Sequence, residues 1–323
     1  MDRWKLFLLA LLSVSIIWAK EPYRAGEGWQ PTGQPIYLGG YLSLLTDFRD
    51  GSQTIAVDEL ALMLYGEYDR WGFMSELETV APYARTFGEG AGETVHAHLH
   101  LERLYATYYI DDDSELTAGK FFSEVGFWNI APINVLRSTT SDPHYIARMF
   151  PNTTTGLLYR QYLPGGTLSL TLQHNRGLDE TFNNFNTKRH YAIAFSTDSG
   201  AGELKSGGGW FEDAAGRRSF YATLAYRANL EACSLTAESA LRRSVEAGAW
   251  YYDVYAQAVW HMRPRHDLIA RFEAYEDDSS VPMDRSAVFG YTYRPYVYMA
   301  IKGELTLRER KPDRLLFSFS MMF

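Results

Sequence analysis

The sequence predicts an all-β fold, a transmembrane antiparallel up-and-down β-barrel of about 16 strands. Three observations predict this fold. A short apolar segment at the N-terminus directs export, apolar and polar residues alternate from Pro35 to Phe323, and tight connections alternate with longer ones. Aromatic residues make up 15% of the chain, which suits a barrel that anchors rings at two membrane interfaces.

The N-terminal segment has the features of a signal peptide. Arg3 and Lys5 precede an uncharged apolar run, residues 6–18, and Ala19 follows it. About 13 apolar residues are too few for a helix that spans a hydrocarbon layer of about 30 Å, which argues against a retained signal anchor. We therefore expect a signal peptide at 1–19, a periplasmic segment at 20–34 and the barrel domain at 35–323.

The C-terminal residues show the alternation most clearly. Successive side chains of a strand point to opposite faces, so every second residue shares a face. One face here is wholly apolar and carries Leu315, Phe317, Phe319, Met321 and Phe323. The opposite face includes Ser318 and Ser320. A strand with one apolar face and one face of mixed polarity is typical of a barrel wall between lipid and water.

The same pattern recurs along the chain and predicts the strands one by one. They cover residues 35–48, 54–68, 71–84, 95–110, 115–126, 155–163, 166–174, 188–197, 202–212, 219–228, 231–242, 250–262, 267–275, 285–293, 297–308 and 314–323. Every second connection is tight, as at Asp69-Arg70 and Pro164-Gly165, and the intervening ones are longer. Short turns at one end and long loops at the other are typical of a membrane barrel.

Membrane burial explains why the sheet must close. An unpaired backbone N–H or C=O costs several kcal/mol in hydrocarbon, so a spanning sheet has no free edge. The alternative is an exported soluble β-protein with its apolar faces packed inward. Rings near strand ends, such as Tyr252 and Trp260 on one strand and Tyr291 and Tyr293 on another, favour the membrane barrel because they suit its interfaces.

Composition and motifs exclude several function classes. A net charge of -8 argues against a nucleic-acid partner, and the lone Cys233 leaves no disulfide and no cysteine-based zinc site. We find no G-x-S-x-G, no H-E-x-x-H and no Gly-rich phosphate loop, so the sequence predicts no enzyme, no cofactor and no metal. A barrel hydrolase of the phospholipase kind stays an alternative, as does an adhesin.

Two regions, the C-terminal strand and the two segments around the longest connection, resemble the porins of Gram-negative outer membranes. The alternating strand that ends at Phe323 is similar to the C-terminal strand of these barrels. The segments LTAGKFFSEVGFWN, from Leu116 to Asn129, and MFPNTTTGLLYRQYLPGGTLSLTLQ, from Met149 to Gln173, resemble those around the third loop of general and phosphate-selective-type porins. The resemblance implies a homotrimer in the outer membrane, in contact with lipid and lipopolysaccharide. It also implies a water-filled channel for passive diffusion of small hydrophilic solutes and ions, or a phosphate-type anion channel.

The longest connection, Phe127 to about Thr154, is the candidate constriction. Structureless loops of this length are usually functional, and porins fold the corresponding third extracellular loop into the lumen. The polar residues that we expect to line the constriction are Asn134, Arg137, Asp142, His144 and Arg148.

Charged residues on the polar faces of the strands are candidates for the lumen wall. They are Glu59, Glu76, Glu78 and Glu102 on the early strands and Arg160, Arg227, Arg242, Arg271, Lys302 and Arg308 on the later strands. If both groups lie at one height, a transverse field crosses the pore. Their heights, and therefore the ion preference, stay open at this stage.

Three details concern the fourth and fifth strands. His96, His98 and His100 alternate with apolar residues, which predicts that all three line the lumen rather than bind a metal. Glu102 and Arg103 break the alternation, and a β-bulge there would turn Arg103 inward. The facing of Lys120 stays open.

Overall fold

The computed structural model describes residues 23–95, 98–131, 133–180, 183–276 and 283–323. The expected signal peptide, 1–19, lies outside the described residues. Within them, no helix is long and apolar enough to cross a bilayer. Nearly all of the ordered structure belongs to one antiparallel sheet, which is closed.

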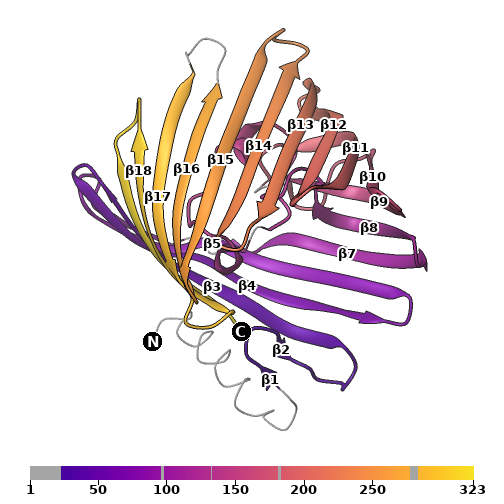
Figure 1. Ribbon diagram of the computed structural model, residues 1–323, viewed down its shortest axis with the longest axis horizontal. Coiled ribbons are helices and arrows are strands. Elements are labelled where there is room, and N and C mark those ends of the chain that lie inside the picture. The colour runs from indigo at the N-terminus through magenta and orange to yellow at the C-terminus, as the bar shows by residue number, and fades with distance from the viewer. Residues whose placement is uncertain (1–22, 96–97, 132, 181–182, 277–282) are drawn as a thin grey trace.

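In the described part of the chain, 16 strands form the barrel wall. They are β3 (Ile36–Arg49), β4 (Ser52–Tyr68), β5 (Trp71–Gly88), β7 (His100–Asp111), β8 (Ser114–Phe122), β9 (Thr153–Leu163), β10 (Gly166–Gln173), β11 (Thr187–Ser199), β12 (Gly202–Asp213), β13 (Arg218–Asn229), β14 (Cys233–Ser244), β15 (Trp250–Arg263), β16 (His266–Glu276), β17 (Asp284–Tyr293), β18 (Met299–Arg308) and β19 (Arg314–Met322). Each pairs with its neighbours in chain order, as Figure 1 shows. The predicted fold class is confirmed.

The last strand closes the barrel against the first wall strand. β19 pairs antiparallel with β3, from Leu315 opposite Phe48 to Met322 opposite Tyr41. The terminal Phe323 continues this ladder, because its N–H donates to the carbonyl of Gly40 and its carbonyl accepts from the N–H of Gly40, both at 2.9 Å. The seam therefore satisfies backbone groups up to the final residue.

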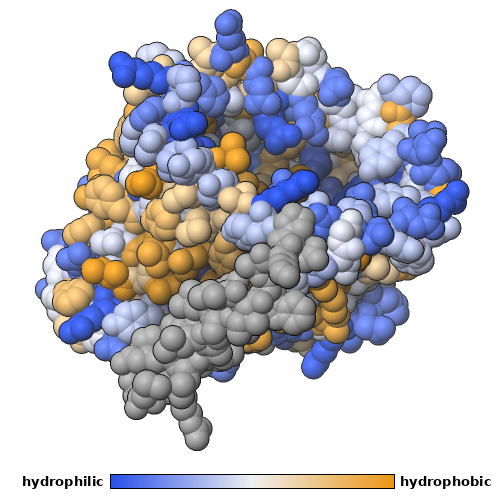
Figure 2. Space-filling model, turned by 90° about the horizontal axis from the view of Figure 1, so that it is seen from below, coloured by the Kyte–Doolittle hydropathy of each residue, from blue (hydrophilic) through white to orange (hydrophobic). Residues whose placement is uncertain are grey.

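Burial in this barrel is opposite to that of a soluble protein. On β19, Phe317 is 49% exposed, whereas its neighbour Leu316 is 1% exposed and Ser318 is buried. Inner residues of other strands include buried charges such as Lys302 and Glu304. Tyr252, Trp260 and other rings are exposed on the outside, and Figure 2 shows apolar side chains gathered over part of the outer surface. The wall therefore has an apolar outer face and a largely polar inner face, as membrane barrels do.

Three short strands supplement the wall. β1 (Tyr23–Arg24) and β2 (Gly28–Trp29) form a small hairpin within the expected segment 20–34, and Trp29 pairs with Leu38 of β3. β6 (Gly92–Val95) pairs with the far end of β5. One turn end of the barrel has the tight connections 69–70, 112–113 and 164–165, and the opposite end has longer ones, including 123–152 and 174–186.

The fourth and fifth wall strands differ from their predicted bounds. The predicted strand 95–110 begins only at His100, and the predicted strand 115–126 ends at Phe122. The regular backbone of β5 is interrupted at Ala81 (φ 45°), next to Pro82. Before this point residues 71–78 of β5 pair with β7, and after it residues 83–86 pair with β6. The described residues just before β7, His98 and Leu99, lie outside the sheet.

This break corrects the histidine prediction. His98 is exposed and lies outside any strand, whereas His100 is buried in β7, and His96 lies outside the described residues. The shared strand face predicted for all three is therefore wrong. The predicted bulge is confirmed, because Arg103 pairs with Glu76 while Leu101 pairs with Leu77, which leaves Glu102 as the extra residue.

Lys120 now has a defined environment. Its ammonium group is buried and donates to the carbonyls of Leu101 at 2.7 Å and Asp179 at 2.9 Å. The Asp179 carboxylate accepts the N–H of Leu101 at 2.6 Å. Side chains therefore satisfy backbone groups of β7 where the sheet ladder is interrupted.

Candidate pore constriction and lumen wall

The connection between β8 and β9 spans residues 123–152, and we call it the inward loop because its described residues, 123–131 and 133–152, lie inside the barrel. It contains a short 3-10 helix, η1 (Asn134–Leu136), and one helical turn, α2 (Tyr145–Arg148). Both contact inner-wall strands: η1 contacts β18 and β19, and α2 contacts β14 and β15. Asn184 of the connection 174–186 also donates to the Ile146 carbonyl of α2 at 3.0 Å. The long third loop predicted to fold into the lumen is therefore found there.

The start of the inward loop is held by Glu238 of β14. Its carboxylate accepts the N–H groups of Phe127 and Trp128, both at 3.0 Å, and also the hydroxyl of Tyr255. Gly126, just before them, has a φ of 62°, and a Cβ there would collide with the Glu238 carboxylate. A left-handed glycine is therefore needed where the chain turns into the lumen.

Apolar packing also holds the inward loop against the strands around Glu238, β12 to β15. Trp128, Tyr145 and Phe150 belong to a buried cluster with inner-wall residues of β12 to β15. The wall residues of this cluster are Phe211, Tyr221, Ala240 and Tyr255. The lumen therefore contains a dry contact between loop and wall, in addition to its polar surfaces.

Lys302 of β18 and Arg294, which follows β17, bind the loop backbone. The Lys302 ammonium donates to the carbonyl and side-chain oxygens of Asn134, at 2.5 and 2.7 Å, and to the Thr139 carbonyl at 3.1 Å. Arg294 donates to the carbonyls of Val135 and Arg137. These cations satisfy carbonyls of a segment that has little secondary structure of its own.

A third group of contacts fixes residues 139–144. Arg271 donates to the Thr139 hydroxyl at 2.7 Å and to the carbonyl and hydroxyl of Ser141, both at 2.9 Å. Glu304 accepts the Ser141 hydroxyl at 2.6 Å. The His144 ring pairs with Asp253 at 2.8 Å and stacks on Tyr275 with ring centres 3.7 Å apart.

The five candidate loop residues have different environments. Asn134 is buried under Lys302, and His144 is held by Asp253. Arg137 pairs with Asp142 and lies over the Trp128 ring at 5.2 Å. Asp142, with 48% of its side chain exposed, and the exposed Arg148 are the members most open to solvent.

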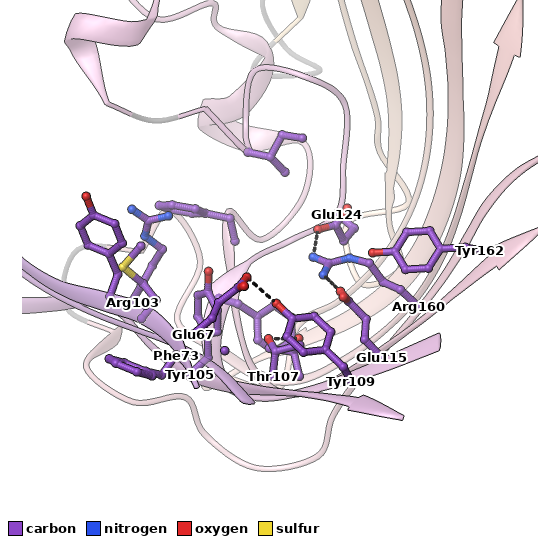
Figure 3. A pocket seen from close by; sticks show the side chains of 18 residues that line it. Glu67, Phe73, Arg103, Tyr105, Thr107, Tyr109, Glu115, Glu124, Arg160 and Tyr162 are labelled. Atoms are coloured by element: carbon purple, nitrogen blue, oxygen red, sulfur yellow. Dashed lines mark hydrogen bonds and ion pairs between the residues drawn. The ribbon is translucent and has the colours of Figure 1, made fainter. Parts of the chain in front are cut away.

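Two sets of cavities lie along the lumen. One cavity of about 540 Å³ lies toward the tight turns and is lined by β4, β5 and β7 to β9 (Figure 3). A cavity of about 290 Å³ shares Glu124, Ile130 and Arg160 with it. Another cavity, of about 400 Å³, lies toward the longer loops and is lined by Ser141 to His144 of the inward loop and by basic residues that include Arg308.

The first cavity mixes aromatic rings with paired charges. In Figure 3, Arg160 lies between Glu115 and Glu124 and pairs with both, at 2.6 Å for Glu124, and Tyr109 donates to Glu67 at 2.9 Å. Burial opposes ionisation of Glu124, but Arg160 and Lys205 outweigh it, so its pKa is below the ordinary value. Glu124 is therefore an ionised residue of the lumen.

Glu124, Lys205 and Arg103 line these cavities and are not among the site residues predicted from the sequence. Lys205 lies on the polar face of its strand, which could have identified it. Glu124 fell inside a predicted strand that in fact ends at Phe122, so no strand alternation could have placed it.

Most of the basic candidates of the later strands contact carboxylates, aromatic rings or the inward loop. Arg227 pairs with Glu203 at 2.9 Å and lies over Phe127, and Arg242 lies over Tyr251 with 4.0 Å to the ring centre. Arg271 and Lys302 are buried under the inward loop. Arg308 lines the cavity toward the longer loops.

The acidic candidates gather on adjacent strands of the early wall. Glu59 is on β4, Glu76 and Glu78 are on β5, and Glu102 is on β7. Glu76 pairs with Arg103, and Arg137 and Asp142 of the inward loop lie near enough to Glu59 to influence its charge. The acidic residues expected on one side of a transverse field therefore lie together on three adjacent strands.

No protein-family model and no curated protein matches this chain. Solved structures do. OmpF of Salmonella typhi, in complex with daunomycin, aligns with a TM-score of 0.66 and 12% identity over 94% of this chain and 100% of that chain. An anion-selective porin from Comamonas acidovorans aligns with a TM-score of 0.62 and 11% identity, over 89% and 99%. The trimer form of in-vitro folded OmpT, an outer membrane protein of Vibrio cholerae, gives 0.63 and 9%, over 89% and 99%. The chain thus has the fold of outer-membrane porins.

Proposed function

We propose that this chain is a porin of a Gram-negative outer membrane, a water-filled channel for passive diffusion of small hydrophilic solutes and ions. The observation that carries the proposal is the inward loop, which is bonded to the inner wall and has cavities on both of its sides. An apolar outer face supports insertion among lipid and lipopolysaccharide. The shared fold with proteins described as outer-membrane porins adds further support.

We also propose that the narrow part of the channel prefers cations. Four acidic side chains, those of Glu59, Glu76, Glu78 and Glu102, gather on adjacent strands, and in the described structure Arg103 pairs with one of them, Glu76. Of the basic residues of the later wall, Lys302 binds the inward loop, and Arg227 and Arg271 pair with carboxylates. A wall of one sign raises the local concentration of counter-ions.

A planar bilayer separates this function from its alternatives. Purified protein should give stepwise conductance, and its reversal potential in a KCl gradient should have the sign of a cation-preferring pore. Heat-denatured protein is the control. Glu102→Gln should shift the reversal potential toward anions. An anion preference in the unaltered protein would favour the phosphate-type channel, and ester hydrolysis without conductance would favour the hydrolase.

We propose a homotrimer as the assembled form. The trimeric OmpT structure, which shares the fold, supports this assembly. Native mass spectrometry of the protein extracted in mild detergent should give three copies per particle, and conductance should close in three equal steps. A single copy per particle that still conducts would contradict the trimer and leave the channel proposal intact.

A further inference from the structure

We propose that Glu78, His100 and Glu102 form a binding site for a divalent transition-metal ion on the lumen wall. One ligand atom from each of the three residues lies within 4.8 Å of the others. Nε2 of His100 is 3.8 Å from Oε2 of Glu78 and 3.6 Å from Oε2 of Glu102. The inference uses the proposed channel for access of the ion from water, and the site itself is defined by the wall strands.

The sheet, rather than a loop, positions the three side chains. Glu78 of β5 and His100 of β7 are direct cross-strand partners, which places their side chains on the same face. Glu102 follows two residues later on that face, at the bulge opposite Glu76 and Leu77. Because backbone pairing fixes all three positions, the ligand set is organised before any ion binds.

The charges around the site favour a cation. Glu76 precedes Glu78 by two residues on the same face of β5, Glu59 lies on the neighbouring strand β4 and Glu102 on β7, so four carboxylates lie in this part of the wall. Among these four carboxylates only Glu76 pairs with an arginine in the described structure, Arg103. Burying carboxylates together is costly unless a cation or a proton compensates them.

Glu76 gives an independent indication beside the ligand set. It is fully buried, its Oε2 accepts from Arg103, and the Tyr41 hydroxyl lies beside both Glu76 and Glu78, but no donor of the described residues is in hydrogen-bonding geometry with Oε1 of Glu76. A buried carboxylate oxygen without a donor lacks the compensation that buried polar groups normally have. A metal ion held by the neighbouring Glu78, His100 and Glu102 would supply positive charge there.

The ligand types and distances select the class of metal. Tetrahedral zinc with bonds of about 2.0–2.2 Å places adjacent ligand atoms about 3.4 Å apart, which is close to the two separations in this cluster. Imidazole favours zinc and similar transition metals, whereas calcium and magnesium prefer oxygen ligands alone. The Glu102 side chain is 22% exposed, which leaves a coordination position facing the lumen.

Zinc binding to untagged, chelator-treated protein in detergent tests the proposal. Isothermal titration with ZnCl2 should give one ion per chain, and Glu102→Gln and His100→Ala should each weaken binding by at least about tenfold. The matched control is His174→Ala, which removes an exposed histidine bonded to Tyr191 and should leave binding unchanged. Heat-modifiable migration on gels establishes that each variant is folded.

Two outcomes would overturn the site: unaltered protein that takes up no zinc, or zinc affinity that Glu102→Gln leaves unchanged in a folded protein. Because Glu102 is partly exposed, this variant keeps the test decisive even if His100→Ala does not fold. The channel proposal can fail separately from the metal site. A protein that binds zinc through these residues but conducts no ions would support the metal site and contradict the porin proposal.

Discussion

Individual charged residues in this barrel have roles that exposure alone would not suggest. Lys302 and Arg271 are almost fully buried, yet each makes several hydrogen bonds to one irregular segment. A charged group donates stronger hydrogen bonds than a neutral one, so a few inner-wall side chains can hold a loop that lacks a core of its own. Inner-wall cations that could attract anions in the channel are therefore used to anchor the inward loop.

Glu238 offers a test at this scale. Replacing it in Glu238→Ala removes the acceptor for the N–H groups of Phe127 and Trp128, and each unsatisfied buried donor costs about 1–3 kcal/mol. We expect a looser inward loop, seen as increased single-channel noise and conductance. Glu246→Gln is the control, because Glu246 lies in the connection 245–249 and pairs with exposed Arg218. Recordings identical to the unaltered protein would contradict the anchoring role.

Arg137 and Arg148 carry positive charge on the inward loop. Neutralising both as Arg137→Gln and Arg148→Gln should move the reversal potential in a salt gradient toward cations, because the loop then contributes less positive charge to the pore. Arg148 is exposed, whereas Arg137 is paired with Asp142, so the Arg148 change alone should carry most of the shift. An unchanged reversal potential would place neither residue in the ion path.

Among the elements, the wall strands were predictable and one inserted segment was not. Regular alternation gave each of the 16 wall strands, most of them to within a few residues. β7 differs at its start, because beyond the left-handed residue Ala81 the partner strand β5 pairs with β6 instead of β7, and His98 and Leu99 lie outside the sheet. Strand pairing depends on the neighbour, and a single-strand pattern contains no information about it.

The seam between β19 and β3 gives an element-scale prediction. Phe319→Asp places a charge on the lipid side of β19, which costs up to about 2 kcal/mol near the bilayer midplane. Deletion of Phe323 removes two backbone hydrogen bonds to Gly40. Both changes should lower the fraction of heat-modifiable, membrane-inserted protein. Arg310→Asp, in the exposed connection between β18 and β19, should have no such effect.

At the scale of the whole molecule, the closed wall and the inward loop are separable structures. The wall is continuous through backbone pairing that does not include residues of the inward loop. The loop fills part of the lumen and meets the wall through two apolar clusters and several buried charges. The barrel should therefore assemble without the loop, although its pore would differ.

Replacing residues 130–147 by a short Gly-Ser connection tests this separation. We expect a protein that still shows heat-modifiable migration and that conducts more per open step, because the inner wall is freed of the loop. The residues newly facing water, including Arg271 and Lys302, can be hydrated in an open lumen, and their charges should then shift selectivity toward anions. Loss of assembly would show that the loop is part of the folding unit.

The sequence by itself determined the barrel. The alternation with a period of two residues predicts which face of each strand is apolar and faces outward. A sheet with such a face in hydrocarbon must close, because unpaired backbone groups at a free edge are costly there. Only the tertiary structure decided which charges remain free for function. The grouping of Glu78, His100 and Glu102, and the burial of Lys302 under Asn134, depend on cross-strand pairing and on contacts between residues far apart in the chain. Periodicity along one strand reports the face of a side chain but neither its height in the lumen nor its partner.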